Sequence, residues 1–261
     1  MKLDYFSKKR WTGVIFLAVF IVLSIWVASY TRFDLSRGLG SFVKAFNWTI
    51  SSFYPDSASL VRLPAILIKL RETIFMAIAS TTIASVFALF FALSGSKVTQ
   101  VNSFLSIVSR GIASFSRNIP VVAWAMILLF SFGQSSLTGF LALFVATFGF
   151  LTRAFIESID EVGHEPVEAL KASGGNYFHI VFQAVLPMSL SQIISWILYM
   201  IETNIRSATL LGILTGTGIG FLFDLYYKTF NYHAASLVVV VIVIAVFFIE
   251  FLSNYIRRLI L

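Results

Sequence analysis

The sequence predicts an all-α integral membrane protein with about six transmembrane helices. Hydrophobic residues make up 58% of the 261 positions, charged residues only 12%, and the mean hydropathy is +0.90. This composition excludes an ordinary water-soluble domain. Several charge-free runs reach the roughly 20 apolar residues that a helix needs to cross the hydrocarbon core. Helices are expected because lipid cannot satisfy the hydrogen-bonding groups of an open strand.

The first two predicted spans contain no charged residue, and they cover residues 11–30 and 73–96. Residues 1–30 also resemble a secretory signal, with a basic start and an apolar core. An uncharged run of this length is long for a signal core, and Val27-Ala28-Ser29 is a poor cleavage site. We therefore expect residues 1–30 to form a cytoplasmic N-terminus followed by a retained transmembrane helix.

Residues 31–72 are expected to form an extracytoplasmic or interfacial segment. Trp48, Phe53 and Tyr54 in this segment suit a helix that lies at the membrane surface. The path of this segment is not fixed by the sequence.

The later spans are predicted from three apolar runs. The run 118–152 is too long for one span, and polar residues interrupt it at 132–136. We expect two helices there, the earlier of which begins near Ile112. A fifth span covers about 188–211, and a sixth covers about 234–252.

Lysine and arginine set the expected orientation. Short basic segments precede the first span, join the second to the third and close the chain: Lys2, Lys8, Lys9, Arg10, Lys97, Arg110, Arg117, Arg257 and Arg258. Basic loops face the cytoplasm, so six spans place both termini inside and make residues 153–187 a cytoplasmic connection. The net charge of +7 is therefore interpreted as topology, and no nucleic-acid partner is expected.

The cytoplasmic connection is predicted to be a helical hairpin. The Glu-Pro pair at 165–166 begins a helix, and the glycine pair at 174–175 ends it. Asn176 caps a second helix over 177–186, which ends before Pro187. From composition alone, a solvated acidic loop is the alternative.

The order and spacing of several residues in this connection resemble the loop signature of ABC importer permeases: Glu168-Ala169-Leu170, Gly174, Ala184 and Leu186-Pro187. Ala184 stands where that family usually has Ile, and Leu170 stands where Ala is common. The resemblance implies a coupling helix that docks in a groove of a cytoplasmic ATPase. It assigns ATPase coupling to Glu165, Glu168, Ala169, Gly174, Leu186 and Pro187. A short capped helix with an apolar edge is a compact docking element.

A second run resembles the signature stretch of phosphonate transporter permeases: Leu198-Tyr199, Glu202, Asn204, Arg206-Ser207-Ala208-Thr209, Gly212 and Gly218-Ile219-Gly220. The likeness covers roughly residues 60–258, and Tyr54-Pro55-Asp56 is similar to a further family feature. Where the family usually has a denser glycine cluster, this chain has Thr215, Gly216 and Thr217.

This resemblance implies a type I ABC importer permease core of five helices, here residues 73–258, plus an extra N-terminal helix. It implies an inner-membrane homodimer of permease subunits, two cytoplasmic ATPase subunits and an extracytoplasmic substrate-binding protein. The cargo would be a phosphonate or a related oxyanion, moved by alternating access. ATP and Mg would be used by the partner ATPase, and this chain would bind no cofactor.

Three polar residues, Glu202, Asn204 and Arg206, lie inside the fifth predicted span. A buried arginine there costs about 3 kcal/mol on insertion scales, so some contact must offset it. Glu202 and Arg206 are four residues apart, in the favourable orientation for a salt bridge that merely permits insertion. Alternatively, Arg206 lines an anion path with Asn204, Ser207 and Thr209 as further donors. The sequence leaves both interpretations open.

Small residues recur every four positions after this group, at Ala208, Gly212, Gly216 and Gly220. On one continuous helix they would share a face and permit a tight helix contact. Gly218 interrupts the spacing, so we expect the helix to bend or unwind near the outer surface. An unwound end would expose N–H groups that hold an anion. A simple packing face is the alternative.

Other chemistry is not indicated. No G-x-x-x-x-G-K-[ST] motif occurs, so ATP hydrolysis by this chain through a P-loop is not expected. The three histidines are far apart and predict no metal site, and the chain has no cysteine. An integral membrane enzyme would need a cluster of ionisable residues at one depth. An ATP-independent channel or secondary transporter for an anion, with Glu202 and Arg206 carrying a coupling ion, is the remaining alternative.

Overall fold

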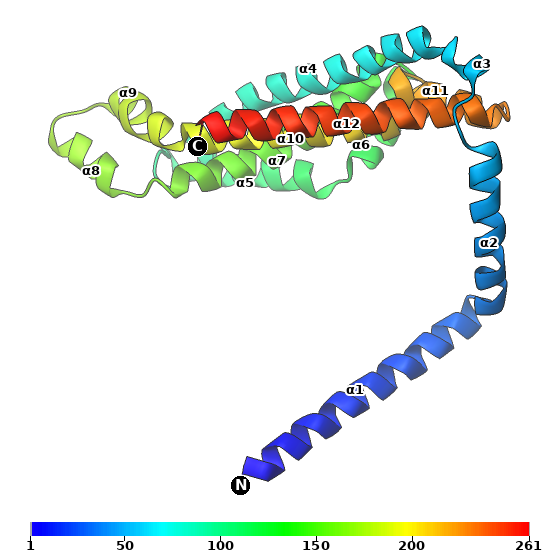
Figure 1. The fold of residues 1–261 in the computed structure, drawn as a ribbon. Helices are drawn as coiled ribbons and strands as arrows, with labels where there is room; N and C mark the ends of the chain where they lie inside the picture. The colour runs from blue at the N-terminus through cyan, green and yellow to red at the C-terminus, as the bar shows by residue number, and fades with distance from the viewer. Residues whose placement is uncertain (1, 261) are drawn as a thin grey trace. The chain divides into compact units, whose positions relative to one another are not determined.

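The computed structural model describes residues 2–260, and every regular element among them is helical (Figure 1). The all-α prediction is therefore confirmed. The chain divides into two compact units, Met1–Phe53 and Tyr54–Leu261. The first residue of the predicted N-terminal segment lies outside the described residues.

The first unit consists of two helices, α1 (Lys2–Tyr30) and α2 (Leu35–Ser52). The apolar part of α1, Lys9–Tyr30, is long enough to cross a membrane and contains the predicted first span. The Asp34 side chain caps α2 by accepting a hydrogen bond of 3.0 Å from the Arg37 backbone N–H. A helix is thus present in the segment that the sequence assigned to the membrane surface.

The second unit contains the remaining helices in this order: α3 (Ser57–Leu60), α4 (Leu63–Gly95), α5 (Ser103–Asn118), α6 (Val121–Phe132), α7 (Ser136–Asp160), α8 (Glu165–Ala172), α9 (Tyr177–Ile180), a π-helical segment (Val181–Val185), α10 (Leu186–Thr215), α11 (Gly218–Lys228) and α12 (Tyr232–Ile260). Helix α7 is central and contacts α4, α5, α6 and α10. Helices α4, α10 and α12 run side by side in Figure 1 and contact one another.

The start of the second unit is fixed by the residues Tyr54-Pro55-Asp56. Asp56 caps α3 by accepting a hydrogen bond of 2.7 Å from the Ser59 backbone N–H, which lowers the pKa of its carboxyl group. The Tyr54 ring packs edge-on against His233 at the start of α12, and the Tyr54 carbonyl oxygen lies 2.7 Å from His233 Nδ1. This contact joins the first residue of the unit to the start of its last helix.

Five described helical segments are long and apolar enough to cross a membrane, and a sixth crossing exists if α5 and α6 are counted as one broken span. The predicted third span was a single helix beginning near Ile112. The structure corrects this, because α5 and α6 meet at an angle of 91°. Pro120 explains the break. It has no N–H to donate and it forces Ile119 into an extended conformation (ψ 123°).

Two other boundaries differ from the prediction. Helix α4 begins at Leu63 instead of residue 73, since the Lys69–Glu72 ion pair of 2.7 Å lets the charged residues join the helix. The expected stop before Pro187 is wrong, because the chain is helical from Tyr177 to Thr215. Just before Pro187 the turns widen: the Leu186 N–H donates to the Val181 carbonyl, five residues back. A π-helical turn of this kind accommodates the missing donor of a proline.

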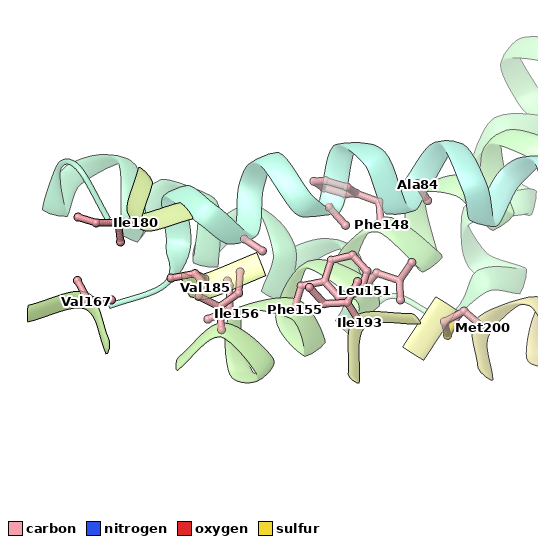
Figure 2. Close-up of a cluster of buried hydrophobic side chains, with 13 residues drawn as sticks. Ala84, Phe148, Leu151, Phe155, Ile156, Val167, Ile180, Val185, Ile193 and Met200 are labelled. Carbon is pink, nitrogen blue, oxygen red and sulfur yellow. The ribbon is translucent and has the colours of Figure 1, made fainter. Parts of the chain in front are cut away.

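The main buried cluster joins the membrane-crossing helices to the α8–α9 loop, residues 161–180 (Figure 2). Ala84, Ala88 and Ala92 give α4 a face of small residues against α7, where Leu151 and Phe155 are fully buried. Two residues of the loop segment, Val167 of α8 and Ile180 of α9, are buried in the same cluster. The loop is therefore packed onto the membrane helices and is not a separate solvated segment.

Candidate functional site

Glu202 lies between two arginines from different helices. Glu202 as a whole is 9% exposed. Its Oε1 is 2.9 Å from Nη2 of Arg206, which lies one turn further along α10. Its other oxygen, Oε2, is 3.5 Å from Nη2 of Arg257 on α12. The intrahelical pair foreseen in the sequence is thus present. The Arg206 side chain is 47% exposed, so the pair leaves part of this cation at the surface of the chain.

The sequence interpretation missed the contact with Arg257, which it assigned only to topology. Arg257 Nη2 also donates to Ser253 Oγ at 3.1 Å, while its Nε is buried and has no partner among the described residues. The contact arises from the packing of α12 on α10. No local pattern around residue 257 indicates it.

Asn204 is buried and bridges three helices. Its Nδ2 donates to Thr81 Oγ1 of α4 at 2.8 Å and to Thr147 Oγ1 of α7 at 2.7 Å. A residue two positions from Arg206 lies on the opposite side of a helix, because each residue turns the helix by 100°. The amide therefore serves the core and does not join Arg206 as a surface donor, which corrects the grouping expected from the sequence.

The other two residues expected beside Arg206 differ in their surroundings. The Thr209 hydroxyl donates to the Ile205 carbonyl of its own helix at 3.1 Å, and Ser207 is half-buried. A role for either residue in passage stays a prediction.

Replacement of Asn204 by Leu is expected to destabilise the chain. The side chains are similar in size, but two fully buried threonine hydroxyls lose a donor. The expected loss in free energy of unfolding is about 1 kcal/mol, as found for hydrogen bonds between membrane helices. Thermal unfolding of the purified chain in detergent would measure it. A variant as stable as the parent would show that the bridge contributes nothing.

A polar stripe along α10 was also missed. Ser191, Ser195, Tyr199, Glu202 and Arg206 recur every three or four residues and so share one face of the helix. The N-terminal part of this stripe borders a hollow of about 580 Å³, lined by Glu161, Ser191, Gln192, Ser195, Trp196, Tyr199 and Arg257. The four-residue spacing of Ser191, Ser195 and Tyr199 was the signal in the sequence that could have predicted this stripe.

The expected break after α10 is present at the glycines. Gly216 and Gly218 adopt left-handed conformations, with φ values of 68° and 62°, and α11 begins at Gly218. Helix α11 then packs against α10 so closely that a Cβ on Gly220 would collide with the Thr209 carbonyl. The small residues therefore do not share one helix face. Gly212 and Gly220 meet across the α10–α11 contact instead.

The N–H groups at this break are not free, contrary to expectation. The Ile219 N–H donates to Thr73 Oγ1 at 2.9 Å, and the Glu72 carboxylate faces the Gly218 N–H. Ser136 Oγ donates to Glu72 Oε1 at 3.0 Å. A carboxylate at the start of α11 would repel an anion. A role of Gly216, Gly218 and Gly220 in passage stays a prediction, and free N–H groups at the break no longer support it.

Helix α8 has the predicted beginning and end. Glu165 and Glu168 lie in its first turn, where their negative charges interact favourably with the positive end of the helix dipole. Gly174 has a φ of 87° and donates to the Lys171 carbonyl, while the Gly175 N–H donates to the Leu170 carbonyl. These two bonds form a Schellman ending.

The outer surface of α8 is exposed at Glu165, Glu168 and Ala169, opposite the buried Val167. Asn176 caps the next helix as predicted, with a reciprocal bond from its backbone N–H to His179 Nδ1. Leu186 and Pro187 lie within a continuous helix, and only Leu186 is half-buried.

Asp160, at the end of α7, fixes the point where this loop begins. Its Oδ1 accepts hydrogen bonds from Ser96 Oγ (2.6 Å) and the Lys97 backbone N–H (2.7 Å). Its Oδ2 is 3.1 Å from Arg110 Nη2, and Arg110 Nε also donates to the Gly95 carbonyl. No sequence pattern assigned Asp160 a role of its own.

Comparison with known proteins identifies the family. Residues 84–261, more than half of the chain, match the family described as the binding-protein-dependent transport system inner membrane component. The phosphate-import permease protein PhnE of Mycolicibacterium smegmatis is 33% identical over 141 residues, which are 54% of this chain and 26% of that protein. The chain thus aligns with about a quarter of that relative's length.

Two further proteins are similar over longer regions. The phosphite transport system permease protein PtxC of Stutzerimonas stutzeri is 30% identical over 189 residues, 72% of this chain and 69% of that protein. A solved structure of the MetNI methionine ABC transporter in inward-facing conformations has the same fold. Its TM-score is 0.67 at 22% identity, and it covers 75% of this chain and 96% of that chain. The chain therefore belongs to the family of inner membrane components of binding-protein-dependent transport systems, as a multi-pass membrane protein.

Proposed function

We propose that the chain is the permease subunit of an ATP-driven importer for phosphonate or a related phosphorus oxyanion. The names of the two relatives, a phosphate-import and a phosphite permease, support this class of cargo. The chain itself provides the path and hydrolyses no ATP. It needs no bound cofactor, because ATP and Mg serve the partner ATPase.

The partners follow from the family. A second permease subunit, a copy of this chain, would complete the path. Two cytoplasmic ATPase subunits would bind at the loops that contain α8, and an extracytoplasmic binding protein would deliver the cargo. Both termini are placed in the cytoplasm, which the basic residues at the ends of the chain support.

The observation that carries the proposal is the polar face of α10. Arg206 is a half-exposed cation in a helix long enough to cross the membrane, and it stands at the outer end of the stripe that starts at Ser191. An arginine fork suits oxyanions because it can donate two parallel hydrogen bonds. A charge at such depth is costly and marks a substrate pathway more often than simple packing.

The loop and this polar face belong to one helical element. The chain is helical from Tyr177 beside α8 to Thr215, and Glu202 and Arg206 lie on that same element. Val167 and Ile180 hold the loop against α7 through the shared buried cluster. A movement of α8 driven by a docked ATPase would therefore be carried along α10 to its polar face, as alternating access requires.

Replacement of Arg206 by Gln is expected to reduce uptake of the oxyanion by tenfold or more, about the value of one charge-assisted hydrogen-bond pair. The purified complex should remain intact, because Glu202 keeps its contact with Arg257. Arg258→Gln, the same change at an exposed terminal arginine, is the control. Full uptake by the Arg206 variant would make this arginine purely structural.

The assignment as a whole is tested by ATPase activity of the chain purified with its ATPase and binding protein in lipid. Phosphate, phosphite and methylphosphonate would be supplied in turn. Stimulation by one loaded binding protein is expected. Oxyanion uptake by the chain without an ATPase would instead favour the channel or secondary transporter.

A further inference from the structure

A second hollow, with two arginines in its lining, lies between the end of α5 and the last turns of α7. Its volume is about 220 Å³, and its lining consists of Ser114, Arg117, Asn118, Arg153 and Glu157. Since one water occupies about 30 Å³, the hollow has room for a small tetrahedral oxyanion with a few waters. Two arginines against one glutamate give it a net charge of about +1.

The hollow lies beside the last turns of α7, because its lining residues Arg153 and Glu157 precede the end of that helix at Asp160 by seven and three residues, or about 10 and 5 Å. The Arg117 backbone N–H packs on Gly149 of α7, where an added Cβ would come within 2.5 Å of its nitrogen. Gly149 precedes the end of α7 at Asp160 by eleven residues, or about 16 Å along the helix. Only the Arg117 end of the hollow reaches this level, and Arg117 and Glu157 are exposed at its two ends. Charges at that depth are expensive unless they face a partner or a water-filled path.

The donors in the hollow are largely unused by the protein. Arg153 Nε is 2.7 Å from Glu157 Oε1, but Arg117 has no ion pair with any described residue. Within residues 2–260 as described, neither the Ser114 hydroxyl nor the Asn118 amide makes a hydrogen bond with the protein. Four side chains with N–H or O–H groups thus converge on a space where Glu157 is the one anionic acceptor in the lining.

The backbone beside the hollow is broken, as is typical of helices that line a substrate path in transporters. The break at Ile119-Pro120 leaves α6 without a side-chain cap at its first turn. Non-helical backbone at membrane depth is tolerated only where protein covers it or where it borders a water-filled cavity. Broken helices near the middle of the membrane commonly form the substrate sites of transporters.

A single aromatic ring separates this hollow from the polar face of α10. The Arg117 guanidinium lies over the Phe150 ring, 5.5 Å from its centroid. Phe150 in turn packs against Trp196 and Tyr199, at centroid distances of 5.7 and 6.0 Å. Trp196 and Tyr199 line the hollow beside α10. The two hollows are therefore neighbours across Phe150.

We propose that the α5–α7 hollow is an oxyanion-binding site on the transport path, in addition to the site at Arg206. Arg117 and Arg153 would each donate to the anion oxygens, and Ser114 and Asn118 would supply the remaining donors. Glu157 competes with the anion for Arg153. This inference rests on the proposed function, because it assumes an oxyanion cargo.

The test is binding of inorganic phosphate and methylphosphonate to the full chain in lipid nanodiscs, followed by uptake through the complete complex. Arg117→Gln is expected to weaken oxyanion binding about tenfold or more. Arg117→Lys keeps the positive charge but loses the guanidinium fork. Its affinity for the oxyanion should therefore lie between those of the parent and Arg117→Gln. Arg258→Gln is the matched control and should bind as the parent does.

Glu157→Gln removes the competing carboxylate and is expected to tighten binding a few-fold. This gain cannot result from misfolding, which keeps the test valid if the Arg117 variants prove unstable. Uptake of oxyanion by the parent, with unchanged affinity in both Arg117→Gln and Glu157→Gln, would overturn the site and leave the proposed function standing. A parent complex that neither binds nor imports any oxyanion would overturn both.

Discussion

Gly174→Val is expected to abolish coupled uptake while the chain remains inserted and bound to its ATPase. Gly174 has a φ of 87°, which a β-branched residue adopts only at a cost of about 1–3 kcal/mol. The substitution would disrupt the Schellman ending of α8 and so misplace the exposed residues Glu168 and Ala169. Uptake of the cargo and ATP hydrolysis would be measured on the same reconstituted complex.

The control for this substitution uses the same position. A Cβ at Gly174 would meet no atom within 4 Å, so crowding plays no part and only the backbone conformation matters. Gly174→Asn should therefore retain most of the uptake, because asparagine tolerates the left-handed region. Equal uptake by the Val and Asn variants would refute the argument from the backbone.

Glu168→Ala tests the docking contact itself, since Glu168 is exposed and makes no ion pair within the described part of the chain. Its loss should leave α8 formed and reduce the stimulation of ATP hydrolysis by the loaded binding protein. If stimulation and uptake both survive, the docking assignment of this residue fails.

The predictions that succeeded depend on neighbours in sequence. Gly174 ends α8 and Asn176 caps α9, because each residue type fits a local backbone requirement. The expected stop at Pro187 failed for a related reason. Proline removes one helical hydrogen bond, but a π-helical turn and burial of Val185 keep the helix continuous. Tertiary packing overrode the local signal.

The functional contacts were less predictable because they join distant segments. Glu202 reaches Arg257 across 55 residues, Asn204 reaches Thr81 across 123, and Asp160 reaches Ser96 across 64. Such pairs depend on which helices pack together and on their rotation. The sequence marked Glu202 and Asn204 as unusual, but it could not separate a buried bridge from a residue beside the path.

Glu202→Gln is expected to lower the stability of the chain strongly for a substitution that changes so few atoms. The Glu202 side chain is 11% exposed, and its loss of charge leaves Arg257 facing no described carboxylate. Breaking a buried ion pair typically costs about 3–5 kcal/mol, and we expect the lower end because Arg206 is already half-exposed. Thermal unfolding in detergent would measure the loss.

Asp224→Asn is the matched control, since it removes the acid of another i,i+4 pair, Asp224–Lys228, whose lysine is 71% exposed. An exposed pair contributes at most about 1 kcal/mol, so this variant should be nearly as stable as the parent. A similar loss in both variants would show that burial of Glu202 does not matter.

The double variant Glu202→Gln with Arg257→Gln separates stability from transport. It removes the uncompensated arginine together with the acid, so part of the lost stability should return, and the interaction energy of the pair follows from the cycle of single and double variants. Uptake should stay low, because Arg206 has lost the carboxylate that holds it on the polar face of α10. If uptake returns together with stability, Glu202 serves only to let α10 and α12 pack. If stability returns alone, Glu202 positions Arg206 for the anion.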